Sequence, residues 1–152
     1  MTIRCSSLSP LLLLALAACS GRADARDAPP PKLAPALEPT ELVGEWQLIA
    51  LPNGPALVPD QTPYIEFFEN RIRGHTGCNT VAGPLASDSV SMRLGRLAVS
   101  KVGCPSPEAV TVERALLGAL QAARIFGMHG RQLVVAGQGR VELARFEMGG
   151  SR

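Results

Sequence analysis

Two cysteines and two histidines are the residues whose chemistry first suggests a site in this sequence. His75 and Cys78 lie three positions apart, and Cys104 and His129 follow further along the chain. Two thiolates and two imidazoles can bind zinc tetrahedrally, but structural zinc sites usually draw their ligands from close sequence pairs. Because Cys104 and His129 each stand alone, the spacing disfavours such a site. We therefore expect neither a metal nor a cofactor.

A disulfide between Cys78 and Cys104 is the better interpretation of the two thiols. In an exported protein, an even number of remaining cysteines is usually paired. From the length of the loop that the bond would close, we expect it to stabilise the folded domain by roughly 3–4 kcal/mol through chain entropy. Two buried free thiols remain the alternative, which the geometry of the fold decides.

The sequence offers few candidates for catalysis. It contains no Gly-x-Ser-x-Gly, no His-Glu-x-x-His and no phosphate-binding loop. One enzymatic alternative stays open, a small hydrolase or metal-dependent enzyme in which His75 acts with a nearby carboxylate such as Glu66. A deep pocket joining His75 to a buried carboxylate would support this alternative, and a shallow surface would oppose it.

A basic strand face is a second candidate for binding. Arg71, Arg73 and His75 alternate with apolar or small residues, which places the three on one side of a strand. Such a face can meet an anionic glycan or a lipid head group, or it can simply be solvated. The whole chain has 15 basic and 13 acidic residues. The chain is therefore nearly neutral, and it lacks the excess of basic residues that is typical of a nucleic-acid-binding protein.

The N-terminus has the features of an export signal. Arg4 precedes the apolar run of residues 11–18, which ends in small residues before Cys19. The run is shorter than the roughly 20 residues of a membrane-spanning helix, and its order of charge, apolar core and small residues is that of a signal peptide. Residues 16–19, Leu-Ala-Ala-Cys, also resemble the lipobox of bacterial lipoproteins. We expect residues 1–18 to be removed and Cys19 to carry the lipid that attaches the protein to a membrane.

The residues after Cys19 predict a tether to the outer membrane. Ser20, rather than aspartate, follows the lipidated cysteine, which resembles the default for sorting to the outer membrane in enterobacteria. Residues 19–39 are rich in proline, alanine and charge without an apolar period, which predicts an extended disordered segment. Residues 40–148 have a typical length for one domain. We expect this domain to face the periplasm from the cell envelope.

The pattern of the domain predicts an α+β fold. Short alternating segments bounded by turn residues predict about eight strands, at residues 42–50, 63–69, 71–76, 89–94, 97–102, 125–128, 132–136 and 140–146. One helix is expected over residues 109–124, capped by Ser106 and with Pro107 in its first turn. In the last strand Val141 and Leu143 share a face that excludes Phe146, which predicts either a bulge or burial on both sides. Short connections favour a curved antiparallel sheet or partly closed barrel with the helix packed on it.

Several short motifs of the domain resemble the META domain, the HslJ-like family. Residues 42–48 resemble its opening Leu-x-Gly-x-Trp-x-Leu with Trp46, and residues 97–104 resemble the strand that ends in its second cysteine, Cys104. Where the family commonly has Thr-Met-Met-Ala before that cysteine, this chain has Ser-Lys-Val-Gly. Glu113, Leu116 and Leu120 fit the helix that follows. The central Gly-x-x-Gly-Cys-Asn-x-x-x-Gly is represented by Gly74, Gly77, Cys78, Asn79 and Gly83.

The resemblance implies a small α+β domain that is often exported or lipid-anchored. Members of the family are linked to heat shock, to tolerance of some antibiotics, and to secretion or virulence in parasites, and no agreed catalytic activity is known among them. The sequence therefore predicts a non-catalytic envelope lipoprotein with a stress-response or binding role. Its partner would be an envelope protein or ligand that the sequence does not identify.

Overall fold

The computed structural model describes residues 42–88 and 90–149. The predicted signal peptide, Cys19 and the tether lie outside the described residues. Within them, the chain forms nine strands, one α-helix and one short 3-10 turn, η1 (Gln138–Arg140). The helix is α2 (Pro107–Ala122), and the strands are β1 (Gly44–Ala50), β2 (Tyr64–Phe67), β3 (Arg71–His75), β4 (Thr80–Ser87), β5 (Met92–Leu94), β6 (Ala98–Val99), β7 (Ile125–His129), β8 (Gln132–Ala136) and β9 (Glu142–Met148).

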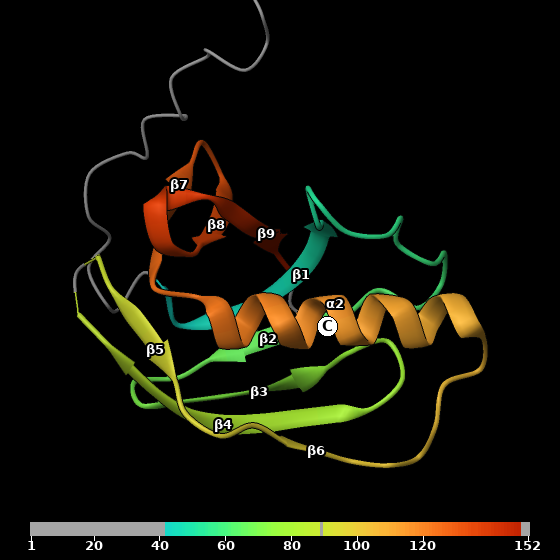
Figure 1. Cartoon of the computed structure of the whole chain (residues 1–152). Coiled ribbons are helices and arrows are strands. Elements are labelled where there is room, and N and C mark those ends of the chain that lie inside the picture. The colour runs from blue at the N-terminus through green and yellow to red at the C-terminus, as the bar shows by residue number, and fades with distance from the viewer. Residues whose placement is uncertain (1–41, 89, 150–152) are drawn as a thin grey trace, which may run out of the picture.

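Eight of the strands form one antiparallel path that curls almost into a barrel. Their order is β5-β4-β3-β2-β1-β9-β8-β7, and the short β6 pairs with β4 beside this path. The two ends of the path meet, because Ser91 forms an isolated bridge with Ile125. The Met92 amide also donates to the carbonyl of Arg124 over 2.9 Å. The predicted curved antiparallel sheet with one packed helix is therefore confirmed (Figure 1).

Strand β4 is absent from the elements that the sequence predicts. Gly83 and Pro84 interrupt its apolar pattern, and proline is rare inside a sheet because it donates no hydrogen bond. The chain compensates by using the carbonyl of Pro84, which accepts the amide of Gly95 at 3.0 Å. Two other strands are shorter than predicted: β5 covers only part of residues 89–94, and β6 covers only part of residues 97–102. Val90 lies outside β5 and is 48% exposed, whereas Met92 in β5 is buried.

The concave side of the sheet holds the core. Trp46, Leu48, Ile65 and Phe67 point inward from β1 and β2, and each is at most 1% exposed. The indole nitrogen of Trp46 donates to the carbonyl of Leu42 over 2.9 Å, so the polar atom of this large side chain is satisfied inside the core. Trp46 and Leu48 therefore share the inward face of β1.

Helix α2 closes the open side of the sheet, where Figure 1 shows it lying across the strands. Its start follows the predicted signals, because the Ser106 hydroxyl accepts the Ala109 amide at 3.2 Å and Pro107 occupies the first turn. Residues at helical spacing form its buried stripe: Val112, Leu116, Leu120 and the following Ala123. At 16 residues α2 is too short to cross a bilayer, and the described part of the chain contains no longer apolar helix.

The last strand contains the predicted bulge. Val135 pairs with Ala144 whereas Ala136 pairs with Glu142, so one extra residue, Leu143, lies in β9. The bulge turns Ala144 and Phe146 into the core, where both are fully buried. Val141, which was predicted to share a face with Leu143, lies just before β9 and is 53% exposed.

Candidate functional site

The family-motif residues meet at the turn between β3 and β4. The Thr76 amide donates to the Asn79 carbonyl at 2.8 Å, and the Asn79 amide donates to the Thr76 hydroxyl at 3.0 Å. Gly77 has a φ of 92°, a conformation that other residues rarely adopt. At Gly74 a Cβ atom would lie 2.1 Å from the carbonyl oxygen of Tyr64 on β2. These glycines allow the turn and the close approach of β3 to β2.

Gly83 has a packing role on β4. A Cβ atom there would lie 2.6 Å from the side chain of Leu97, in the segment between β5 and β6. Leu97 packs against the core in the space that the missing side chain leaves. The motif glycines are thus explained by geometry, and none of them requires a ligand.

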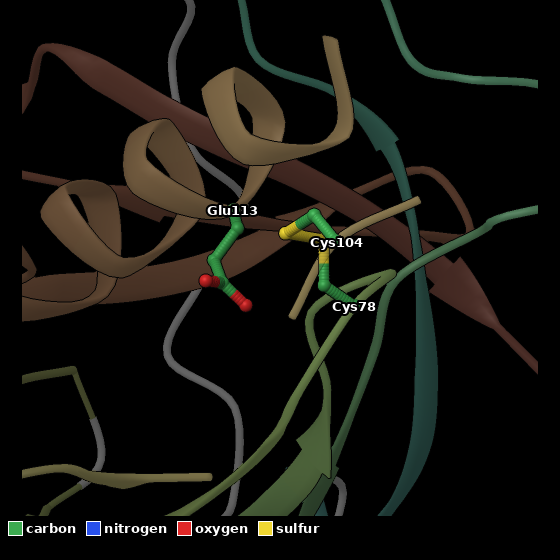
Figure 2. Close-up of side chains that lie close together, drawn as sticks. All are labelled: Cys78, Cys104 and Glu113. Carbon is green, nitrogen blue, oxygen red and sulfur yellow. A yellow bond between two sulfur atoms is a disulfide. The ribbon is translucent and has the colours of Figure 1, made fainter. Parts of the chain in front are cut away.

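The predicted disulfide between Cys78 and Cys104 is present. Their Cα atoms are 4.7 Å apart, and 26 positions separate them in the sequence. The bond joins the β3–β4 turn to the segment just before α2, as Figure 2 shows. It therefore fixes the start of the helix against the sheet.

Asn79 ties the same two segments together by hydrogen bonds. Its side-chain oxygen accepts the amides of Val102 at 2.8 Å and Gly103 at 3.3 Å, and the hydroxyl of Ser100 at 3.2 Å. Its side-chain nitrogen donates to both carboxylate oxygens of Glu113, at 3.1 and 3.0 Å. Asn79 is only 5% exposed, so these bonds satisfy a buried amide.

Glu113 reaches this cluster from α2. Its carboxylate contacts the hydroxyl of Thr76, which is fully buried, as well as the amide of Asn79. Thr76, Asn79, Ser100 and Glu113 thus form one polar network beside the disulfide. The sequence places Glu113 on the helix but predicts neither its contact with Asn79 nor a role for Thr76. The apolar pattern gives no sign of this contact, because 34 residues separate Asn79 from Glu113.

The sulfur and carboxylate atoms form the one group of three close metal ligands within residues 42–88 and 90–149. One ligand atom each from Cys78, Cys104 and Glu113 lies within 4.8 Å of the others. The two sulfurs are bonded to each other, and a disulfide sulfur lacks the thiolate charge that binds zinc. His75 and His129 do not belong to the group. The arrangement does not match the two-cysteine, two-histidine site weighed from the sequence.

His75 and Glu66 lie on the outer face of the sheet but have different partners. Glu66 accepts two hydrogen bonds from Arg73, at 2.6 and 3.2 Å, and these bonds raise the pKa of the guanidinium. The Nδ1 atom of His75 accepts the Gly77 amide at 3.1 Å, and its ring stacks on Tyr64 with centroids 6.4 Å apart. The carboxylate of Glu66, which the enzymatic alternative pairs with His75, is therefore bound by the guanidinium of Arg73 instead.

The predicted basic face is a real feature of β3. Arg71 and Arg73 are exposed, and both guanidinium groups lie over the ring of Phe68, at 5.7 and 4.9 Å from its centroid. Next to them is a hollow of about 570 Å³ over β3, β4 and β6. Its lining includes Tyr64, Arg73, Thr80, Ala82, Ala98 and Ser100. Neither His75 nor Glu66 lines this hollow.

Comparisons with known proteins agree with this architecture. An NMR structure of a protein from Burkholderia xenovorans is similar at 20% identity and a TM-score of 0.60, covering 82% of this chain and 97% of that one. A crystal structure of a DUF4847 family protein from Bacteroides vulgatus is similar at 15% identity and a TM-score of 0.53, covering 73% and 96%. At these identities the likeness shows the fold alone. A comparison with curated proteins finds no match.

The family itself follows from the sequence match. The model of the META domain matches residues 40–149, which span the whole of the folded part described above. The disulfide, the Asn79 network and the motif glycines lie within that match. The chain belongs to the META domain family.

Proposed function

We propose that this protein is a lipid-anchored lipoprotein of the cell envelope whose META domain has a non-catalytic binding role. The domain would be attached to the outer membrane and face the periplasm. The disulfide between Cys78 and Cys104 is the observation that carries the proposal. Such bonds persist in oxidising compartments and are rare in the cytosol. The disulfide supports export, which the lipobox-like residues before Cys19 predict independently.

A binding role is favoured over hydrolysis by the contacts of the candidate residues. Glu66 is occupied by Arg73, and the Nδ1 atom of His75 is occupied by a backbone amide. Because Nδ1 accepts that amide, the neutral ring of His75 carries its proton on Nε2 and has no second lone pair with which to act as a general base. It also lacks the carboxylate that orients the histidine in most hydrolases. The buried polar network of Glu113, in turn, is used to hold α2 on the sheet. A role in the stress response is consistent with the family and belongs to the same proposal.

Metabolic labelling with palmitate tests the anchor. We expect the full-length chain to incorporate label and to sediment with outer-membrane vesicles. The lipobox resemblance implies a diacylglycerol on the Cys19 thiol and an acyl chain on its amine, and these three chains exceed the two signals that stable anchoring requires. The variant Cys19→Ala should lose both properties, whereas the matched variant Ser20→Ala should keep the label. Equal labelling of Cys19→Ala and the unchanged protein would refute the anchor.

A further inference from the structure

We propose that the hollow on the outer face of β3, β4 and β6 is a binding groove for a saccharide chain that carries carboxylate groups. The proposal rests on the binding role proposed above and names the class of ligand. The hollow measures about 570 Å³, which is within the range of small-molecule sites. It is the place where the basic face of β3 meets a stretch of small side chains.

The shape of the groove follows from the strand register. Arg73 on β3 pairs with Ala82 on β4, and Ala82 pairs with Ala98 on β6. Outward side chains therefore change from large to small across neighbouring strands, which leaves a floor of alanines next to a wall of Arg73 and Tyr64. A sugar ring needs such a combination, a flat apolar surface together with hydroxyl groups at its rim. The alanines supply the apolar surface, while Tyr64, whose ring stacks on His75, and Thr80 each offer a hydroxyl.

The charge of the groove selects a weakly anionic ligand. Arg73 is the one charged residue in its lining, and Glu66 binds the Nε and Nη2 atoms of that guanidinium. The Nη1 atom takes no part in this ion pair and can donate to a ligand oxygen. Since Glu66 already offsets much of the charge of Arg73, a dianionic phosphate would be repelled by the carboxylate. A carboxylate with a single charge fits better.

A chain rather than a single sugar fits the surroundings. Val99 and Ser100 border both this groove and a second hollow of about 430 Å³, which is lined on its far side by Lys101 and Glu113. A saccharide that passes over Ser100, just after β6, would therefore extend from Arg73 to a second cation, Lys101. The Glu113 carboxylate of that second hollow is already bound by Thr76 and Asn79. Ser100, at the border of the two hollows, is held in place before any ligand binds, because its hydroxyl accepts the Thr80 amide at 3.1 Å and donates to Asn79 at 3.2 Å. Such preorganisation favours binding.

Calorimetric titration of the lipidated protein in detergent micelles tests the groove. The probes are trigalacturonate, which carries three carboxylates, and maltotriose, a neutral chain of the same length. We expect trigalacturonate to bind at least ten times more tightly than maltotriose, and to bind less tightly as salt increases. Arg73→Gln removes the cation, and Ala98→Leu fills the floor; each should weaken binding at least tenfold. Arg131→Gln, at the exposed turn between β7 and β8, is the matched control and should leave binding unchanged.

The outcomes separate the groove from its rivals and from the anchor. Equal binding of both probes, or equal losses in Arg73→Gln and Arg131→Gln, would overturn the proposal. Displacement of trigalacturonate by phosphatidylglycerol added to the micelles would assign the face to a lipid head group and would also overturn it. If Ala98→Leu lowers the melting temperature, Arg73→Gln still decides, because this exposed side chain contributes little to stability. Absence of binding would refute the groove while leaving the palmitate result for Cys19 unaffected.

Discussion

The side-chain nitrogen of Asn79 lies 3.1 and 3.0 Å from the two carboxylate oxygens of Glu113, and this contact joins the β3–β4 turn to α2. The opposite end of the same amide accepts hydrogen bonds from the segment before the helix. An asparagine serves here because its side chain has a donor on one side and an acceptor on the other. The family motif thus places an amide where neither a carboxylate nor a hydroxyl would satisfy every partner.

Replacing this amide by a carboxylate is expected to make stability depend on pH. In Asn79→Asp the donor to Glu113 is lost, and two carboxylates face each other about 3 Å apart. At neutral pH their repulsion should lower the melting temperature strongly. As pH falls, one of the two takes up a proton, so stability should recover towards pH 4. Thermal melting followed by circular dichroism between pH 4 and 8 measures this dependence.

The second variant Asn79→Asp/Glu113→Gln is the control for that prediction. It restores one amide and one carboxylate with their positions exchanged, so the rise in stability on acidification should largely disappear. A pH dependence that persists in the double variant would show that the repulsion arises elsewhere.

Breaking the disulfide should lower stability without unfolding the domain. The bond joins two cysteines that are 26 positions apart in the sequence, and the chain-entropy estimate for closing such a loop is about 3 kcal/mol. At roughly 4–8 °C per kcal/mol for a domain of this size, reduction should lower the melting temperature by more than about 10 °C. Melting curves with and without a reductant measure the effect. Superimposable curves would contradict a stabilising role, and Cys78→Ser/Cys104→Ser should match the reduced protein.

Two glycines give opposite outcomes when each is replaced by alanine. At Gly74 the added Cβ atom would lie 2.1 Å from a backbone oxygen of β2, so Gly74→Ala should separate the strands and destabilise the domain severely. At Gly118, on the exposed side of α2, nothing lies within 4 Å of the added atom. Gly118→Ala should therefore stabilise the domain by up to about 1 kcal/mol. Urea unfolding of both variants tests the pair, and a mild effect at Gly74 would be inconsistent with the β2–β3 register.

Trp46 is expected to be a major contributor to the core. It is 1% exposed, and truncation of a fully packed tryptophan typically costs about 3–5 kcal/mol. Trp46→Phe keeps most of the apolar contact but loses the hydrogen bond to Leu42, so its cost should be smaller. Chemical unfolding gives both values. An emission maximum typical of a water-exposed indole in the folded protein would contradict the burial on which this ranking depends.

Local sequence patterns were sufficient for most elements and insufficient for the network. Alternation in β3 and the capping residues of α2 involve near neighbours, and both elements were predicted. Strand β4 was missed because Gly83 and Pro84 are poor strand residues that are retained here by contacts with distant segments. The pairing of Asn79 with Glu113 likewise depends on how α2 crosses the sheet. The disulfide could be proposed because only two cysteines remain after Cys19.

Mass spectrometry of the protein isolated from membranes under non-reducing conditions tests the proposed envelope lipoprotein most directly. The intact mass and a peptide map report on the N-terminus, the lipid and the thiols in one measurement. We predict a chain that begins at Cys19 and carries three acyl chains, with a peptide that links Cys78 to Cys104. A chain that retains residues before Cys19 and has no lipid, or one that has two free thiols, would contradict the proposal.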